Sequence, residues 1–227
     1  MSAEGLARPS GIHLSTRSFI PSLKWERALW RGGLQAVAGL DEVGRGPLAG
    51  PLVAAAVVLP RFCARSPWLS GVRDSKLLSA RQREMLDGDI RASSTAIGIG
   101  AVSAAALDVI GVVEATRRAM AEALERLELQ VEHLLIDALS LPEPPIPQTP
   151  LIHGDARCIS IACASIVAKV ARDRMMDDLD RSFPAYGFLQ NKGYGTPQHL
   201  AALQALGPCP IHRQSFAPLR IPPQIEV

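Results

Sequence analysis

The chain has 227 residues, of which 48% are hydrophobic and 20% charged, and its formal net charge is +2. This length suffices for one substantial domain with a core of its own. The net charge is too small to indicate a nucleic-acid binder by itself. The longest apolar stretch falls far short of the roughly 20 residues that span a bilayer, and the four cysteines show no paired spacing. We therefore expect a monomeric, cytoplasmic protein without a membrane segment.

The distribution of charge is more informative than its sum. Acidic residues outnumber basic ones between residues 101 and 143, whereas basic residues outnumber acidic ones between residues 156 and 220. A polyanion such as a nucleic acid would therefore approach the C-terminal half of the chain.

The N-terminal third begins without regular structure. Residues 1–21 mix Gly, Ser, Pro and isolated charges, which predicts a loose segment. The remainder, residues 22–220, is expected to form one domain that opens with a short helix at Leu23–Arg31. Two apolar stretches, Ala36–Asp41 and Leu52–Leu59, are joined by a glycine-rich turn and predict an antiparallel pair of strands.

A helix and a third strand follow this pair. Ser79 with Gln82 three residues later forms a capping box, which predicts a helix that runs to about Arg91. Asp74-Ser75-Lys76 then lies on the loop before this helix. The third strand is predicted at Ile97–Val102.

The middle of the chain predicts a helix between parallel strands. Val112–Leu129 has an apolar face at helical spacing. His133–Asp137 reads as a short buried strand, and after a proline-rich loop Leu151–Asp155 reads as another. A helix that connects strands in this way favours a parallel, right-handed crossover.

Carboxylates therefore follow three of the predicted strands: Asp41 with Glu42, then Asp137, then Asp155. Ligands of open α/β sheets bind beyond the carboxyl ends of the strands, so we expect these acids to converge. Because successive side chains on a strand point to opposite faces, we also expect strand pairing to stop or bulge at Asp41–Glu42. The turn Gly44-Arg45-Gly46 would then face the same site.

The C-terminal part predicts helices and further polar groups. In the predicted helix Ser160–Arg181, the side chains of Ser165, Lys169 and Arg172 follow at helical spacing and form a polar stripe. Thr196 as N-cap, with proline next, predicts a last helix through Leu206. Residues 183–220 would thus form a helical extension.

Four stretches carry a resemblance to a known family. They read D-E-V-G-R-G-P-L-A-G-P from Asp41, D-S-K from Asp74, G-D-A-x-x-x-S-I-A-x-A-S-I-x-A-K-x-x-R-D from Gly154, and K-G-Y-G-T-x-x-H from Lys192. Together they resemble type II ribonucleases H, the ribonuclease HII family. Leu77 stands where the family usually has a second lysine, so in the D-S-K stretch only Lys76 can be matched.

The resemblance implies an α/β, ribonuclease H-like fold, with a mixed five-stranded sheet flanked by helices and a C-terminal helical extension. It implies an endoribonuclease that cleaves the RNA strand of RNA/DNA hybrids and nicks duplex DNA at embedded ribonucleotides. Its products would be 3′-hydroxyl and 5′-phosphate ends. The implied cofactor is Mg²⁺ or Mn²⁺, bound as a pair by carboxylates.

The family's functional residues are matched position by position. The four acids Asp41, Glu42, Asp137 and Asp155 would be the catalytic residues and metal ligands. The groups that read the ribose 2′-hydroxyl would be Gly44, Arg45, Gly46 and Tyr194. The phosphate contacts would be Lys76, Ser165, Lys169, Arg172 and Lys192.

Simpler interpretations stay open beside these assignments. Tyr194 could be a half-buried core tyrosine, and the lysines could lie on a solvated surface. The whole protein could be another nuclease of ribonuclease H-like fold or a hybrid-binding module without catalysis. A type III ribonuclease H is disfavoured, because the residues before Ala36 are too few for the folded N-terminal domain of that class.

Overall fold

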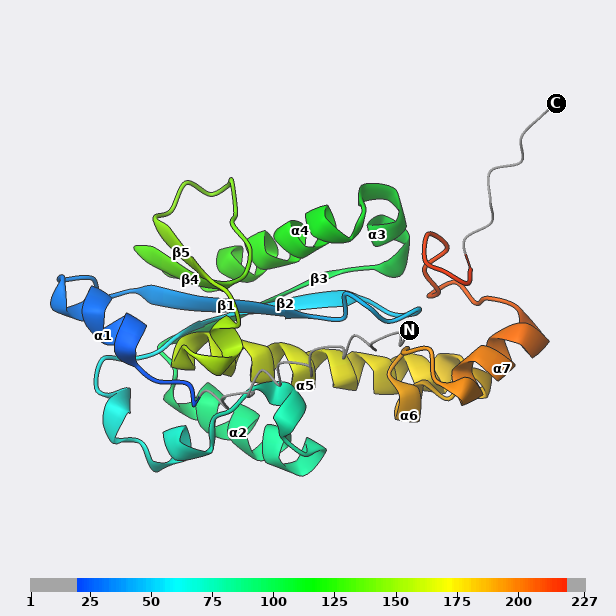
Figure 1. Ribbon diagram of the computed structural model, residues 1–227, viewed down its shortest axis with the longest axis horizontal. Helices are drawn as coiled ribbons and strands as arrows, with labels where there is room; N and C mark the ends of the chain where they lie inside the picture. Colours follow the sequence, from blue (N-terminus) through cyan, green and yellow to red (C-terminus); the bar gives the residue numbers. More distant parts are fainter. Residues whose placement is uncertain (1–19, 220–227) are drawn as a thin grey trace, which may run out of the picture.

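The computed structural model describes residues 20–219, so almost all of the predicted loose segment 1–21 lies outside the described residues. Its centre is a five-stranded sheet in the order β3-β2-β1-β4-β5 (Figure 1). Helices cover both faces of this mixed sheet. The predicted fold class is therefore confirmed.

The strands fall into an antiparallel and a parallel half. The antiparallel half consists of β1 (Val37–Val43), β2 (Leu52–Val58) and β3 (Ala96–Val102). The parallel half adds β4 (His133–Asp137) beside β1 and β5 (Gln148–Leu151) beside β4. Every residue of β2 is buried. This central strand is covered on both faces, which explains its uninterrupted apolar sequence.

Two layers of helices enclose the sheet (Figure 1). On one face, α5 (Ile159–Ser182) lies along the sheet, with α1 (Lys24–Arg31) and α2 (Ala80–Ser93) packed at its sides. The other face carries α3 (Ala104–Ile110) and α4 (Val112–Glu125). None of the described helices is long and apolar enough to cross a membrane.

The C-terminal helices lie beyond one end of the sheet (Figure 1). They are α6 (Phe188–Asn191) and α7 (Pro197–Leu206). A small apolar cluster of their own, which includes Met176, Tyr186 and Phe188, joins them to the end of α5. The Thr196 hydroxyl accepts a hydrogen bond from the His199 amide, so the predicted N-cap is confirmed.

Several boundaries differ from the predictions. The helix α4 ends at Glu125 rather than Leu129, and α3 was not predicted. The left-handed backbone of Gly111, with φ of 78°, separates the two helices. The last strand lies earlier than expected, at Gln148–Leu151. Asp155 is consequently not at a strand end but on the short 3-10 turn Gly154–Ala156.

Candidate active site

Three of the predicted acids converge where β1 and β4 separate. Pairing between these parallel strands ends at Leu40 and Ile136, so Asp41 and Asp137 are the next residues on neighbouring strands. Both side chains lie on the α5 side of the sheet by the alternation of the strand. Asp137 Oδ1 accepts a hydrogen bond of 2.6 Å from the Gly154 amide, which ties β4 to the turn that carries Asp155.

The charges of these acids act on one another. Asp41 is only 5% exposed. Burial raises its pKa well above the usual value, and the negative charges of Glu42, Asp137 and Asp155 raise it further, while a hydrogen bond with Ser165 lowers it. Burial and the charges of Asp74 and Asp137 likewise raise the pKa of Asp155. The cluster therefore favours a cation or a proton at its centre.

Glu42 enters the cluster differently from the three aspartates. The ladder between β1 and β2 continues without interruption through Glu42 and Val43, so the predicted stop or bulge is wrong on that side. On the β4 side, pairing does stop before Asp41, as predicted. The chain turns only at Gly44, and no bulge is needed before it. Alternation places Glu42 on the opposite face of β1 from Asp41. Burial raises its pKa, Arg45 at 3.4 Å lowers it, and the charge of Asp137 still raises it.

The donor set fits a hard divalent cation, because its members offer carboxylate oxygens alone. Burial, and after it the charges of Glu42, Asp137 and Asp155, raises the pKa of Asp41, so a bound cation would stabilise its ionised form. Within residues 20–219, however, no three His, Cys, Asp or Glu side chains already stand around a common metal position. The acids thus form an open arrangement, in which side chains would have to close on an ion.

Lys76 is the basic group that pairs with the aspartates of this cluster, as Arg45 pairs with Glu42. Its Nζ lies 3.7 Å from Asp155 Oδ2, although its side chain is 80% exposed. Partial burial lowers its pKa, but the charges of Asp74, Asp155 and Asp41 outweigh that effect and raise it overall. Lys76 therefore stays protonated beside the acids and remains accessible to a ligand.

The other predicted phosphate contacts are already engaged within the protein. Ser165 is buried, and its hydroxyl lies 2.9 Å from that of Ser75. Lys169 Nζ donates to Asp173 at 2.6 Å, and Lys192 Nζ pairs with Asp177. Both lysines keep partly exposed side chains, so a ligand could compete for them.

Arg172 corrects the prediction of a phosphate contact. It is fully buried, and its guanidinium donates to three carbonyls, those of Ala49, Pro51 and Lys192, at 2.9–3.1 Å. Three of its five N–H groups are used, and because the side chain has no exposed surface, it is not placed to meet a phosphate. Arg172 instead joins the chain after β1 to the Lys192–Tyr194 segment.

A second buried guanidinium, Arg213, holds the Gly44-Arg45-Gly46 turn. It donates to the carbonyls of Gly44, Arg45 and Gly50. Gly44 itself has φ of +91°, and a Cβ there would lie 2.4 Å from Arg172 Nε. Position 44 thus requires glycine, because Arg172 packs against it, and the turn is fixed by hydrogen bonds from Arg213. The sequence offered no signal for Arg213, which lies in an irregular segment.

Tyr194 stands beside this turn with its side chain exposed. The residue is 43% exposed, and the Arg172 guanidinium lies 5.9 Å from its ring centroid. The neighbouring Gly193 carbonyl accepts from the amides of Leu48 and Ala49. The two elements predicted to read the ribose are therefore joined, and the core-tyrosine interpretation does not hold.

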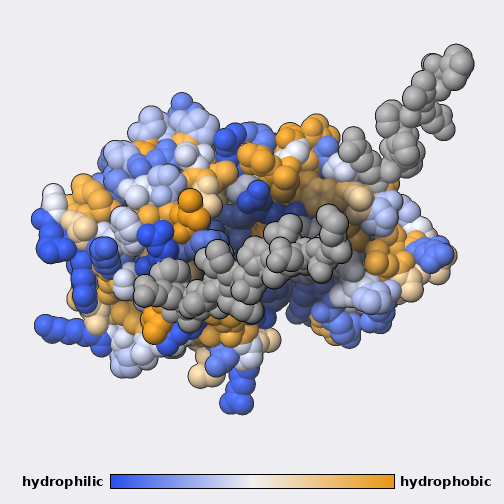
Figure 2. Space-filling model, in the orientation of Figure 1, coloured by the Kyte–Doolittle hydropathy of each residue, from blue (hydrophilic) through white to orange (hydrophobic). Residues whose placement is uncertain are grey.

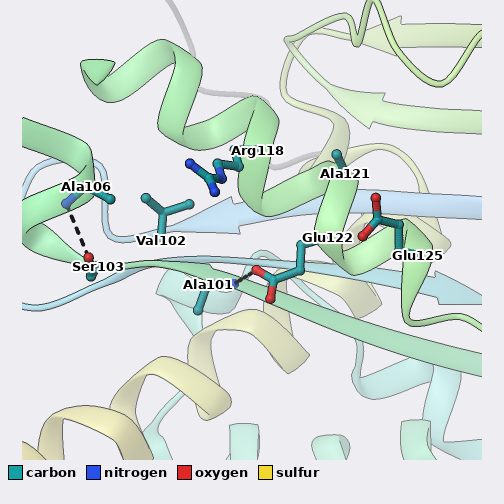
Figure 3. A pocket seen from close by; sticks show the side chains of 8 residues that line it. All are labelled: Ala101, Val102, Ser103, Ala106, Arg118, Ala121, Glu122 and Glu125. Carbon is teal, nitrogen blue, oxygen red and sulfur yellow. Dashed lines mark hydrogen bonds between the residues drawn. The ribbon is translucent and has the colours of Figure 1, made fainter. Parts of the chain in front are cut away.

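The surface carries a hollow lined by hydrophilic residues (Figure 2) and a separate pocket. On the face drawn in Figure 2, hydrophilic residues line a hollow near the middle of the molecule, between the layer of α4 and the C-terminal helices. A separate pocket of about 600 Å³ lies between β3 and α4 (Figure 3). Arg118, Glu122 and Glu125 line it, and none of the predicted site residues does.

Known proteins resemble this chain over most of its length. A ribonuclease HII from Geobacillus kaustophilus is 52% identical over 198 residues, which cover 87% of this chain and 74% of that protein. The crystal structure of ribonuclease H2 from Pyrococcus horikoshii matches with a TM-score of 0.68 at 25% identity, over 81% of this chain and 95% of that one.

A further structure, the complex of PCNA with RNase HII from Archaeoglobus fulgidus, matches with a TM-score of 0.66 at 28% identity. The match covers 80% of this chain and 95% of that one. The model of the family described as Ribonuclease HII matches residues 38–219, which include all four acids, both buried arginines and Tyr194. The chain therefore belongs to the ribonuclease HII family.

Proposed function

We propose that this ribonuclease H endonuclease cleaves the RNA strand of RNA/DNA hybrids and nicks duplex DNA at single embedded ribonucleotides. Family membership makes the protein a hydrolase of phosphodiester bonds. One observation supports the finer statement. A buried cluster of acids stands next to a rigid glycine turn and an exposed tyrosine, which is the combination that a ribose-dependent nuclease needs.

The acids Asp41, Glu42, Asp137 and Asp155 are the proposed ligands of Mg²⁺ or Mn²⁺. When bound, the ions supply activation of a water molecule and stabilisation of the departing 3′-oxygen, which leaves a 3′-hydroxyl and a 5′-phosphate. Asp41 and Asp137 lie on the same face of the sheet, and Asp155 lies on the turn that is bonded to Asp137, so we assign these three aspartates the central ligand positions. Glu42, on the other face of β1, would bind from the side.

Recognition of the ribose rests on the turn and on Tyr194. Only the 2′-hydroxyl distinguishes a ribonucleotide within a DNA duplex. The Gly44-Arg45-Gly46 backbone is held by Arg213, while Arg172 holds the following residues Ala49 and Pro51. The turn therefore offers amides and carbonyls at a fixed position. The Tyr194 hydroxyl would donate to or accept from the same ribose, while its ring packs on the adjacent sugar.

Phosphates on either side would meet the basic side chains. Lys76, beside Asp155, is best placed for the phosphate that is cut. Lys169 and Lys192 would exchange their present aspartate partners for the backbone of the duplex. Ser165 is buried next to Asp41 and would orient that carboxylate. We further propose that residues 22–220 act as one catalytic domain, as a monomer in the cytoplasm.

A single assay tests this function against its alternatives. Purified protein is incubated with Mg²⁺ or Mn²⁺ and a labelled DNA duplex that contains one ribonucleotide, one 2′-O-methyl nucleotide, or none. We expect one nick, at the ribonucleotide only, and no nick in EDTA. A nuclease that merely shares the fold would cut the all-DNA duplex too. A binding module without catalysis would bind the duplex that contains the ribonucleotide but would not cut it.

A further inference from the structure

Two histidines outside the acid cluster form a continuous hydrogen-bonded chain beneath Tyr194. His199 lies in α7 and is fully buried, and His212 follows in the C-terminal segment. Their Nε2 atoms are 3.0 Å apart. His199 Nδ1 lies 2.9 Å from the carbonyl oxygen of Tyr194, and His212 Nδ1 lies 3.0 Å from the amide of Cys209.

The ends of this chain determine where its protons lie. A carbonyl oxygen only accepts, so His199 Nδ1 must carry the proton that it donates to Tyr194. A backbone amide only donates, and the Cys209 amide at 3.0 Å lies nearer to His212 Nδ1 than the Cys209 carbonyl at 3.3 Å, so the shorter contact assigns an unprotonated Nδ1 to His212. If both imidazoles are neutral, the hydrogen bond between the two rings has one possible direction: His212 Nε2–H donates to the unprotonated His199 Nε2. Every donor and acceptor of the pair is satisfied.

The surroundings of the two rings are apolar apart from one thiol. The groups that face them are the rings of Tyr186 and Phe188 and the thiol of Cys209, and no carboxylate or basic side chain contacts them among the described residues. Burial lowers the pKa of His212, and His199 lowers it further. An added proton would place two N–H groups opposite each other at the middle link.

The chain connects two segments of the site. The segment of His212 pairs with the chain after β1: Ala49 forms a bridge with His212, and the Arg213 amide donates to the Leu48 carbonyl. At the other end, the Tyr194 carbonyl receives His199 Nδ1 and also the Thr196 amide at 2.8 Å. The backbone of Tyr194 is thus fixed while its side chain projects outward.

We propose that His199 is a positioning residue, which holds the Tyr194 backbone in register with the Gly44-Arg45-Gly46 turn, and that His212 fixes the tautomer in which His199 donates to Tyr194. This inference rests on the proposed role of Tyr194 at the ribose. It assigns the histidines no contact with substrate. Their effect on cleavage comes from the placement of the tyrosine, since a displacement of about 1 Å at a reacting centre can lower a rate up to about 100-fold.

Two substitutions at the same position separate this role from simple packing. In His199→Asn the amide nitrogen lies as many bonds from Cα as Nδ1 does, so it can still donate to the Tyr194 carbonyl. In His199→Gln the amide reaches the place of Nε2, so it keeps the link to His212 but loses the donor to Tyr194. Tyr194→Phe, which removes only the hydroxyl, reports on the role of the tyrosine itself.

Single-turnover and steady-state cleavage of the one-ribonucleotide duplex is measured for all three variants and the unmodified protein. We expect kcat of His199→Gln to fall about tenfold or more, with KM changed less than about threefold. His199→Asn should retain kcat within about threefold. Thermal unfolding shows whether each variant is folded, and long-range ¹H–¹⁵N spectra of the unmodified protein should show His199 protonated at Nδ1 and His212 at Nε2.

The outcomes are distinct. If Tyr194→Phe cleaves normally, the proposed ribose contact is wrong, and the positioning role falls with it. If Tyr194→Phe is impaired but the Asn and Gln variants lose equal activity in proportion to lost stability, the histidines only pack, and the inference is overturned. The opposite tautomers in the spectra would also overturn it, whatever the activities.

Discussion

At the scale of single residues, the site is governed by charge that the protein leaves unbalanced. Asp41 is buried among like charges, and Lys76, the base beside the aspartates, contacts Asp155 through a largely exposed side chain. Removal of one negative charge should therefore relieve repulsion in the protein without metal, even though the same charge is needed for cleavage. Stability and activity would move in opposite directions at these positions.

We expect Asp41→Asn, Asp137→Asn and Asp155→Asn each to lower kcat by at least about 100-fold while the fold is kept. In EDTA, Asp41→Asn should unfold at a higher temperature than the unmodified protein. We expect its free energy of unfolding to be higher by roughly 1 kcal/mol. Scanning calorimetry with and without Mg²⁺ measures this, and Glu114→Gln on the outer side of α4 is the control. Two variants with near-normal cleavage would refute the assigned acids.

The buried histidine gives a pH dependence of opposite sign to that of the acids. Because burial lowers the pKa of His212, the unfolded chain binds more protons than the folded one below about pH 6.5. The contribution of His212 to the free energy of unfolding is therefore complete at pH 7.5 and is lost as the pH falls. We expect the advantage of the unmodified protein over His212→Gln in urea unfolding to shrink by up to about 1 kcal/mol between pH 7.5 and 5.5. A constant advantage would contradict this.

At the scale of elements, features that depend on neighbouring residues could be predicted from the sequence, whereas features that depend on distant contacts could not. The capping box of Ser79 and Gln82 and the N-cap at Thr196 depend on neighbours three residues away, and both are present. The position of Asp155 depends on where β5 joins β4, which no local pattern specifies. Arg172 showed helical spacing with Ser165 and Lys169, but its burial depends on contacts with residues 49–51 and 192.

The turn after β1 offers a matched pair of glycines. Gly44→Ala would place a methyl group against Arg172 in a left-handed backbone, whereas a Cβ at Gly46 meets no atom within 4 Å. We expect Gly44→Ala to lower the free energy of unfolding by about 1–3 kcal/mol. Gly46→Ala should change it by less than about 0.5 kcal/mol. Urea unfolding measures the free energy of unfolding of both variants. Equal losses would show that the contact with Arg172 does not restrict position 44.

At the scale of the whole molecule, basic groups outside the core should set the affinity for a duplex. Lys76 is exposed beside the acids, so Lys76→Ala should weaken substrate binding and reduce the salt dependence of log Kd by about one unit of slope. Lys24→Ala, on the exposed side of α1, is the control. Titrations between about 50 and 200 mM salt measure both, and equal slopes would assign Lys76 to the solvated surface.

The two buried arginines also tie together parts of the chain that are made at different times. The acids and the glycine turn all precede Arg213 in the sequence, yet the turn receives its hydrogen bonds from that side chain. A growing chain on the ribosome would therefore display every acid before the ribose-reading turn is locked. Nuclease competence would arrive only when the segment around Arg213 folds back onto Leu48–Gly50, so selectivity is the last property that synthesis confers.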